Sequence, residues 1–226
     1  LGGLVISIVT PSRNAGDFLE TAIESVLMSS CAEHFVQDGD STDNTLEILR
    51  RHTSQIHWVR EMDSGQSDAL NRAIAATNGE VVGWLNADDF YLPGALDVVD
   101  DFFKTHPKVD VLHGDFILVD EVGRCLRRVT GYGWRHLLLG TRGSLIPSTA
   151  TFIRRSVLED VYLDVRMRYV MDWDLFLQLR KTRARFHYLR MPFAAFRIHS
   201  AQCDSHRMHL REFSSSISTI FGLPEF

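Results

Sequence analysis

The sequence lacks the motifs of several large enzyme classes. It has no GxxxxGK[ST] loop, no GxGxxG loop after its first apolar run, no HExxH pair and no GxSxG turn. These motifs bind phosphates, dinucleotides or zinc, or expose a serine nucleophile. Their absence removes P-loop NTPases, Rossmann dehydrogenases, zincins and common serine hydrolases from the leading hypotheses.

Cysteine is scarce and long apolar runs are absent. The three cysteines, Cys31, Cys125 and Cys203, form no CxxC pair, which is typical of a reduced, cytosolic protein without structural zinc. No apolar run approaches the ~18 residues that span a bilayer. We therefore expect a cytoplasmic protein whose membrane contact, where it occurs, is peripheral and at the inner face. The formal net charge of -5 argues against a general nucleic-acid binder.

Two patterns of apolar residues, one typical of strands and one typical of helices, alternate along the first half of the chain. Short apolar runs predict strands, and segments with apolar residues on one helical face follow them. Helices of about ten to thirteen residues between strands are typical of crossover units, so we expect an α/β fold with a mostly parallel sheet covered on both faces. The expected strands are 4–9, 35–36, 56–59 and 81–85, and the expected helices are 17–29, 43–52 and 66–77.

The second half of the chain is less regular. No linker divides it from the first half, so we expect one domain over 1–226. Between 120 and 148, glycine and arginine predict a loop with one short helix at 134–139. The other expected helices are 93–104, 172–181 and 206–220, and the expected strands are 109–112, 116–119, 149–153, 186–188 and 193–198.

Each strand of the first half is followed by polar residues. The four segments read TPSRN, QDGDSTD, REMDSGQSD and NADD. In parallel sheets ligands bind beyond the carboxyl ends of the strands. The sequence therefore predicts a polar ligand site at one edge of the sheet.

The second of these segments, with Asp38, Asp40 and Asp43, has the acidic character of a calcium loop. An EF-hand loop from Asp38 requires glycine at its sixth position and glutamate at its twelfth, where this chain has Asp43 and Leu49. The calcium interpretation is therefore rejected. Asp40 is expected to shape a turn with Gly39, and Asp43 to lie at the helix start, near its positive dipole end.

The Asn86-Ala87-Asp88-Asp89 segment is open to two interpretations. Adjacent carboxylates at a strand end can hold a divalent cation, which prefers oxygen ligands and binds phosphate oxygens. The same carboxylates can instead cap a helix that begins near Pro93.

Five ordered segments resemble the family 2 glycosyltransferases, inverting enzymes with a GT-A fold. They are ISIVTPSRNAGDFLETAIESV, VQDGDSTDNTLEIL, DSGQSDALNRAIAATNGEVVGWLNADDFYLPGAL, MDWDLFLQL and FRIHSAQ. Together they span most of residues 5–202, and the resemblance is weakest from about 120 to 165. Their order and spacing are more specific than any one segment.

The resemblance implies a nucleotide-sugar-binding half at 1–119 and an acceptor-binding half at 120–226, with a donor site for a nucleotide-diphosphate sugar in the first half. The first loop would line the nucleotide pocket, Asp38 would accept hydrogen bonds from the base, and Asp88 would reach the ribose hydroxyls. The implied donor-side residues are Thr10, Pro11, Ser12, Arg13, Asn14, Asp38, Asp63, Gln66, Asn71, Arg72, Asn86 and Asp88.

The resemblance also implies a Mn²⁺ or Mg²⁺ cofactor. Asp89 would bind the metal that bridges the diphosphate, and Arg197 and His199 fall in a late strand motif where a histidine can approach the metal. A structural hydrogen-bonding role for His199 remains an equal alternative. Asn86 stands where some relatives carry a carboxylate.

Asp172 takes the position of the family's catalytic base. Relatives often have Glu-Asp where this chain has Met171-Asp172, and Asp174 is the second candidate. Asp172 could also be the N-cap of the following helix. A sugar-accepting hydroxyl has a high pKa and needs such a base as it attacks.

The leading hypothesis is an inverting, metal-dependent transferase. It would move sugar from a UDP-sugar or related donor to a hydroxyl of a glycan or lipid-linked acceptor, in cell-surface polysaccharide assembly. Two alternatives stay open: a sugar-phosphate nucleotidyltransferase and a non-catalytic nucleotide-sugar binding module. For the tryptophans Trp84, Trp134 and Trp173, core packing is favoured over stacking on sugar.

Overall fold

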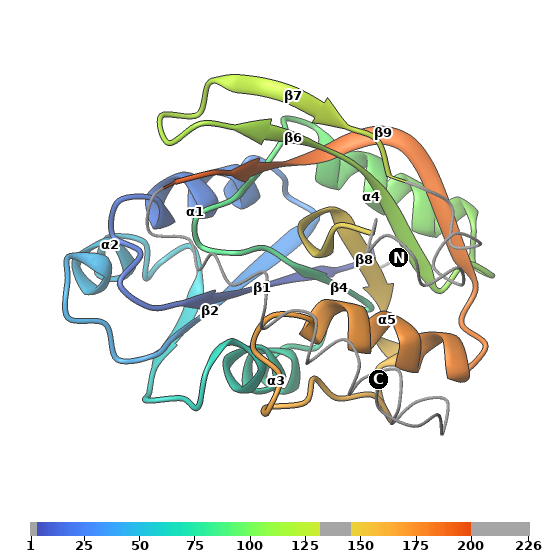
Figure 1. The fold of residues 1–226 in the computed structure, drawn as a ribbon, viewed down its shortest axis with the longest axis horizontal. Coiled ribbons are helices and arrows are strands. Elements are labelled where there is room, and N and C mark those ends of the chain that lie inside the picture. Colours follow the sequence, from blue (N-terminus) through green and yellow to red (C-terminus); the bar gives the residue numbers. More distant parts are fainter. Residues whose placement is uncertain (1–3, 132–145, 200–226) are drawn as a thin grey trace, which may run out of the picture.

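One mixed sheet of nine strands runs through the described part of the chain, with helices on both of its faces (Figure 1). The computed structural model describes residues 4–131 and 146–199. The strand order is β3-β2-β1-β4-β8-β6-β9-β5, with β7 paired to β6. The expected helices at 134–139 and 206–220 lie outside the described residues.

The first half confirms the predicted alternation. Parallel pairing joins β1 to β2 and β4, and β2 to β3. A crossover helix follows each of β1, β2 and β3 before the next strand begins, so all four strands run in the same direction. The elements are β1 (Ile6–Ser12), α1 (Leu19–Leu27), β2 (Ala32–Asp38), α2 (Thr45–Arg51), β3 (His57–Arg60), α3 (Gln66–Ala76) and β4 (Val81–Trp84).

The second half corrects the expectation of a mostly parallel sheet. β8 pairs antiparallel with β4 and β6, β7 with β6, and β5 with β9, while β6 and β9 are parallel. The elements are β5 (Phe90–Tyr91), α4 (Ala95–Thr105), β6 (Val111–Val119), β7 (Cys125–Val129), β8 (Thr151–Arg154), α5 (Met171–Lys181) and β9 (Phe186–Arg197).

The sequence predicted two strands, 109–112 and 116–119, with Gly114 between them, but the structure has one strand, β6, that contains Gly114. A Cβ at Gly114 would lie 2.5 Å from the carbonyl oxygen of Met191. Glycine here allows β9 to approach closely, and the pairing register shifts around it. Gly114 therefore permits close contact between β6 and β9 and does not interrupt β6. The strand β7 was also missed, because its exposed CLRRV sequence lacks a buried face.

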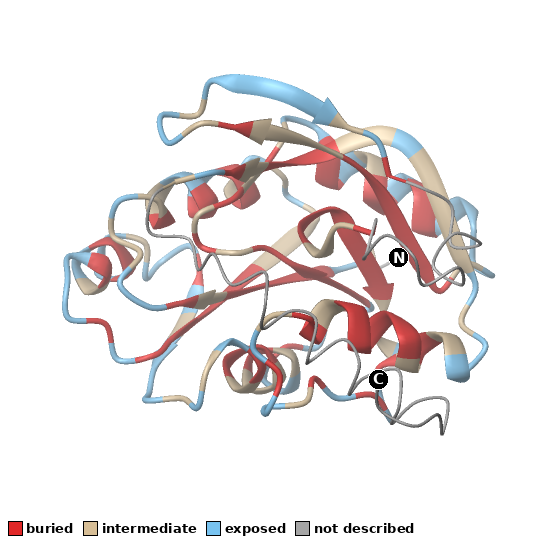
Figure 2. Ribbon diagram, viewed as in Figure 1, coloured by how far each residue is buried: buried red, intermediate tan, exposed pale blue. Residues whose placement is uncertain are grey.

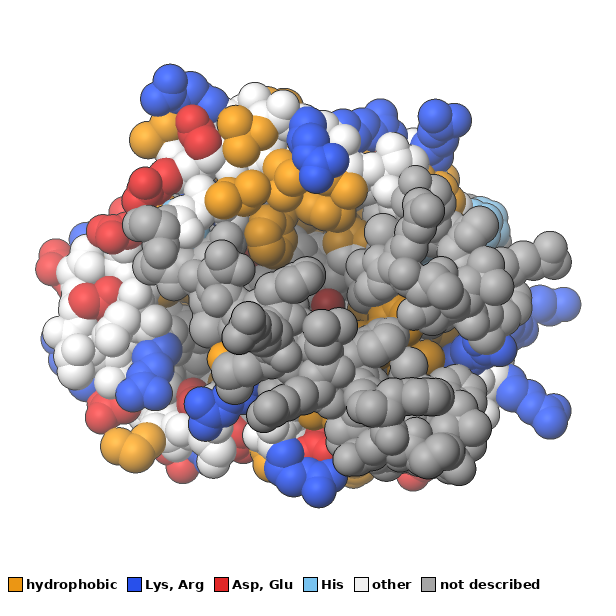
Figure 3. All heavy atoms as spheres, in the orientation of Figure 1, with side chains coloured by type: hydrophobic (Ala, Val, Ile, Leu, Met, Phe, Trp, Pro, Cys, Tyr) orange, Lys and Arg blue, Asp and Glu red, His pale blue; other side chains and the backbone are white. Residues whose placement is uncertain are grey.

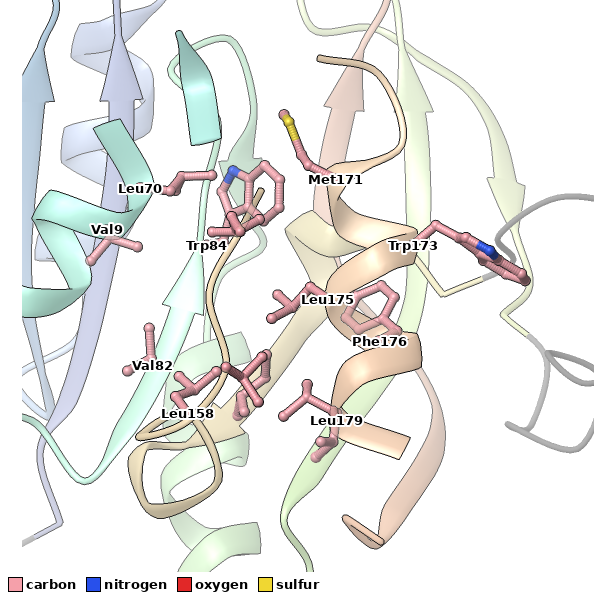
Figure 4. Packing of buried hydrophobic residues seen from close by; sticks show 14 of the residues in the cluster. Val9, Leu70, Val82, Trp84, Leu158, Met171, Trp173, Leu175, Phe176 and Leu179 are labelled. Carbon is pink, nitrogen blue, oxygen red and sulfur yellow. The ribbon is translucent and has the colours of Figure 1, made fainter. Parts of the chain in front are cut away.

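Buried residues lie along the central strands and on the helices that cover them (Figure 2), and most of these residues are apolar. The first cluster packs α3 and α5 against β1 and β4, and Figure 4 shows Leu175 and Leu179 facing Val82 and Leu158. The second packs α1 and α4 against the opposite face. The third joins α1 and α2 to β2.

The predicted core positions of two tryptophans are confirmed. Trp84 is 9% exposed and Trp173 is 3% exposed, and both belong to the first cluster. Trp134 lies outside the described residues. Within residues 4–131 and 146–199, no helix combines the length and the apolar character needed to cross a bilayer.

Candidate active site

The carboxyl ends of the first three strands lie level with one another. Ser12 on β1 is opposite Asp38 on β2, and Asp38 is opposite Arg60 on β3. The register therefore brings the polar segments that follow these strands to one edge of the sheet, as the sequence predicted. The guanidinium of Arg60 lies 2.7 Å from Asp40 and 3.9 Å from Asp38.

Hydrogen bonds tie the loop after β1 to the loop after β2. Asn14 has φ 50°, a left-handed conformation that asparagine tolerates better than most residues. Its backbone N–H donates to Ser41 Oγ at 2.8 Å, and its side-chain oxygen accepts from the N–H of Thr42 at 2.9 Å. Asp43 accepts from the N–H of Gly16 at 2.9 Å and from that of Thr45 at 3.0 Å. Two loops distant in sequence thus form one wall.

A cavity of about 490 Å³ lies against this wall, at the carboxyl ends of β1 and β4. Its size is that of a small-molecule site. Nine residues of the predicted site line it: Pro11, Ser12, Arg13, Asn14, Asp63, Gln66, Asn86, Asp88 and His199. Asp17 and Phe18 also line it, so the cavity contains both acidic and basic side chains.

Asp88 and His199 meet at the cavity although they are far apart in sequence. His199 Nε2 lies 3.0 Å from Asp88 Oδ2, and the histidine ring lies 4.7 Å from the ring of Phe18, centroid to centroid. The hydrogen-bonding role of His199 is therefore observed, and its contact with a metal stays a prediction.

A divalent cation fits the chemistry of this corner. Mg²⁺ and Mn²⁺ take carboxylate, phosphate and water oxygens, and they are often held by one or two carboxylates plus the phosphates of a substrate. Asp88 offers such a carboxylate to the cavity. No group of three or more metal-binding side chains gathers within residues 4–131 and 146–199, so a cation here would depend on oxygens of the donor.

Asp89 is buried behind Asp88, with 1% of its surface exposed. Its carboxylate accepts hydrogen bonds from Thr149 Oγ1 at 2.8 Å, from the N–H of Arg197 at 3.0 Å and from Asn86 Nδ2 at 3.1 Å. Burial, together with the charge of Asp88, raises the pKa of Asp89 to about 7. With protein donors on both oxygens, Asp89 is less suited than Asp88 to bind a metal directly.

Asn86 connects the cavity to the core. Its side-chain oxygen accepts from Trp84 Nε1 and from Gln66 Nε2, both at 2.8 Å. Its amide nitrogen donates to Asp89. An aspartate at position 86 has no amide N–H and could not donate this hydrogen bond to the Asp89 carboxylate, whereas asparagine can.

Four predicted donor residues do not line the cavity. Thr10 and Asp38 are fully buried; Thr10 bonds to His34, and Asp38 accepts from the N–H of Ser41 at 3.0 Å. Asn71 bonds through both amide atoms to the backbone of Leu163. Arg72 pairs with Asp68 and Glu61. Direct donor contacts from these residues stay predictions, while the contacts observed stabilise the protein.

Asp172 lies in the first turn of α5, half-buried, and lines a second cavity. The helix begins at Met171 and its N-cap is Val170, so the N-cap interpretation of Asp172 is wrong. Burial raises the pKa of Asp172 to about 6, although the N–H of Trp173 donates to its carboxylate at 2.7 Å. A raised pKa suits a general base near neutral pH.

The neighbours of Asp172 differ from it in environment. Asp174 is buried and accepts from Gln178 at 2.6 Å. Met171 is 5% exposed, lies in the first cluster, and receives a hydrogen bond from Ser67 at its sulfur. An apolar residue at 171 therefore matches its surroundings.

The capping interpretation of Asp88 and Asp89 is also wrong, because α4 begins at Ala95 with Gly94 as its N-cap.

Several residues shape the site in ways that the sequence analysis did not assign, although Arg197 was named as part of the late strand motif. Thr149 bonds to Asp89 and lines the second cavity. Phe196 lines both cavities. The guanidinium of Arg197 donates to the carbonyl of Asp88 at 2.9 Å and lies 5.0 Å from the ring centre of Phe18. These contacts join β9 to the Asp88 loop, and only the alternation of β9 could have indicated them.

Taken together, the sheet and the two cavities define an α/β domain of the GT-A type. Three solved structures have this fold and cover most of the chain. TarS of S. aureus with UDP-GlcNAc has a TM-score of 0.74 and 18% identity, and the match covers 96% of this chain and 65% of TarS. A mannosyltransferase of Pyrobaculum calidifontis with GDP-Man and Mn²⁺ has a TM-score of 0.71 and 16% identity, over 98% of this chain and 64% of that one. Glucosyl-3-phosphoglycerate synthase of Mycobacterium tuberculosis with Mn²⁺ and UDP has a TM-score of 0.67 and 17% identity, over 98% of this chain and 81% of that one.

The chain belongs to glycosyl transferase family 2, whose family model matches residues 7–162. A PGL/p-HBAD biosynthesis glycosyltransferase of Mycobacterium bovis is 30% identical over 185 residues, covering 75% of this chain and 67% of that protein. An uncharacterized glycosyltransferase of Nostoc is 29% identical over 171 residues. The match covers 70% of this chain but only about half, 53%, of the Nostoc protein.

Proposed function

We propose that this domain transfers a sugar from a nucleotide-diphosphate sugar, with a UDP-sugar as the expected donor, to an acceptor hydroxyl. The observation that carries the proposal is the pair of adjoining cavities. One is polar, lies at the strand ends and presents Asp88. The other presents Asp172, and Phe196 borders both. A donor and an acceptor could therefore meet between Asp88 and Asp172.

In the proposed reaction Asp172 acts as the general base. The acceptor oxygen attacks the anomeric carbon, and its proton passes to the Asp172 carboxylate. The bond from the anomeric carbon to the phosphate oxygen breaks, and its electron pair leaves with the nucleoside diphosphate. A single displacement of this kind inverts the anomeric centre. The pKa of about 6 leaves Asp172 ionised at neutral pH and basic enough to accept a proton.

Asp88 is proposed to hold Mn²⁺ or Mg²⁺ on the donor side, with His199 orienting its carboxylate. A bound divalent cation supplies positive charge that stabilises the leaving diphosphate. Asp89, hydrogen-bonded behind Asp88, is proposed to support the loop. This division assigns the direct metal contact to Asp88 in place of Asp89, because Asp88 lines the cavity and Asp89 is buried.

A thermal-shift screen with product analysis tests the proposal. The purified chain is heated with UDP, UDP-glucose, UDP-GlcNAc or GDP-mannose, with and without Mn²⁺. A ligand that binds the native state raises the melting temperature, so at least one nucleotide sugar should stabilise the protein more with Mn²⁺ than without. Mass spectrometry then follows release of the nucleoside diphosphate.

The outcomes separate the alternatives. Release of pyrophosphate from a nucleoside triphosphate and a sugar phosphate would instead indicate a nucleotidyltransferase. Donor binding with neither hydrolysis nor transfer would indicate a binding module. Absence of stabilisation by any nucleotide sugar would contradict the proposed donor site.

Roles in cell-surface polysaccharide assembly and at the inner face of the membrane remain part of the proposal and rest on the family.

A further inference from the structure

The cavity beside Asp172 is apolar. Its volume is about 250 Å³, and among its described lining residues Asp172 is the only charged one. Most of the others are hydrophobic: Phe116, Leu118, Val129, Ile146, Pro147 and Phe196. The remaining contacts are hydroxyl-bearing, from Thr130, Ser148 and Thr149. A polar donor cavity thus adjoins an apolar second cavity.

The strand register produces this apolar surface. Phe116 and Leu118 alternate on β6, so their side chains share one face. Leu118 is paired with Phe196 on β9, and Phe116 with Val129 on β7. The rings of Phe116 and Phe196 lie 6.1 Å apart between centroids. These four residues form a strip across three neighbouring strands, which we call the β6 strip.

The β6 strip keeps exposed apolar surface. Phe116, Leu118, Val129 and Phe196 are only half-buried, and hydrophobic side chains gather over the β6 and β7 region in the space-filling view (Figure 3). Apolar surface left in water at the mouth of a cavity indicates a binding site for an apolar group.

The position of Asp172 orients whatever binds here. An acceptor hydroxyl must reach the Asp172 carboxylate, which lines the cavity, and Phe196 lines both this cavity and the donor cavity. The rest of the acceptor then lies along the β6 strip. A bare sugar in this place would lose hydrogen bonds to water and gain none from phenylalanine or leucine. An aryl or alkyl group would gain by leaving water.

We propose that the β6 strip binds an apolar aglycone, an aryl or alkyl group carried by the acceptor next to its reactive hydroxyl. The proposal rests on the proposed function for the assignment of Asp172 as the base. It narrows the acceptor from any glycan to an amphiphile with an apolar part within reach of Asp172.

Two glucosides that differ only in their aglycone test the proposal. Phenyl β-D-glucoside and methyl β-D-glucoside present the same sugar hydroxyls, and each is titrated calorimetrically into the chain with UDP and Mn²⁺. The phenyl compound should bind at least about tenfold more tightly, since it alone can cover the strip. Equal affinities, including no measurable binding of either compound, would overturn the proposal.

A matched pair of variants locates the effect. Leu118→Asn, on the strip, should reduce the phenyl preference to about twofold or less, and Leu118→Ala should lower it in the same direction if the asparagine variant folds poorly. Leu126→Asn, on the exposed strand β7 where Leu126 is 56% exposed, should leave the preference unchanged. Equal behaviour of the Leu118 and Leu126 variants would refute the assignment of the strip.

The same samples separate failure of this inference from failure of the proposed function. A UDP titration in the presence of Mn²⁺ reports the donor cavity alone. Normal UDP binding without any phenyl preference refutes only the apolar strip. Phenyl preference without UDP binding instead contradicts the proposed donor site.

Discussion

The two cavities that we propose as donor and acceptor sites are built from different kinds of structure. The proposed donor cavity lies at the ends of parallel strands, and its wall is held by hydrogen bonds such as those from Asn14 to Ser41 and from Thr42 to Asn14. The proposed acceptor cavity lies on β6, β7 and β9, and its surface is mainly hydrophobic side chains. Directional hydrogen bonds fix the shape of the first cavity's wall, whereas the apolar surface of the second cavity makes non-directional contacts.

The two sides also differ in how many of their residues the family resemblance named. The donor side contains the residues that the family resemblance named, including Asp63, Asn86 and Asp88. On the acceptor side only Asp172 was named. Changes on the two sides should therefore have different effects on donor binding, turnover and acceptor preference.

The largest expected effect is that of Asp172→Asn. Removal of a general base typically costs about 10²- to 10⁴-fold in rate, so the turnover of the variant should fall by that range. UDP affinity should remain within about twofold, because Asp172 lies outside the donor cavity. Transfer rates and UDP titrations measure the two sides separately. Near-normal turnover would eliminate Asp172 as the base.

Asp88→Asn should act on the opposite side. Loss of the carboxylate that faces the cavity should weaken Mn²⁺-dependent UDP binding at least about tenfold, in analogy with other metal-site substitutions. Calorimetric titration with and without Mn²⁺ measures this change. The control Asp17→Asn removes another carboxylate of the same cavity and should have a smaller effect on the metal dependence. Equal losses in both variants would argue for a general charge effect.

The pH dependence should report Asp172. Transfer requires its ionised form, and the pKa is raised to about 6, so kcat/KM should fall by about tenfold between pH 7 and pH 5. Stopped assays at pH values from 5 to 7 measure this fall in kcat/KM. A flat profile down to pH 5 would contradict the role of Asp172.

Stability supplies an independent check of the same pKa. The folded-state pKa of about 6 lies above the unfolded value of about 3.9, so the folded state binds the proton more tightly. The contribution of Asp172 to stability is therefore greatest at low pH and is lost as pH rises through 6. Asp172→Asn should raise Tm at pH 7.5 and leave it nearly unchanged at pH 4. A lower Tm at pH 7.5 would contradict this expectation.

The smallest expected effect tests the hydrogen-bonded wall. Ser41 donates to Asp38 at 2.5 Å and accepts from the N–H of Asn14, so Ser41→Ala leaves buried polar atoms with fewer partners. The expected loss is ~1–3 kcal/mol in the free energy of unfolding, with weaker UDP binding. Urea denaturation measures the loss. Ser54→Ala, at an exposed turn serine, should change neither quantity.

Much of the fold could be predicted from the sequence because local signals agreed with the tertiary structure. Amphipathic patterns predicted α1, α2 and α3, whose apolar faces lie against the sheet. The predictions were wrong where residue type and context conflicted. Gly114 was interpreted as a break, and the arginine-rich β7 was interpreted as loop.

The site was partly predictable for a related reason. Polar residues directly after strands must lie at the sheet edge, so Ser12, Asp63 and Asp88 could be placed from the sequence. Asn71 and Arg72 could not be distinguished from ligand-binding residues, since their partners Leu163 and Glu61 are identified only by the folded chain.

By itself the sequence determined the strand and helix pattern of the first half, the polar sheet edge and the family. Only the tertiary structure decided which member of the Asp88-Asp89 pair faces the cavity. That choice depends on Thr149 and Arg197, both distant in sequence, which bond to Asp89 and hold it in the interior. The tertiary structure likewise assembled the β6 strip, because its residues come from three strands that meet only through long-range pairing.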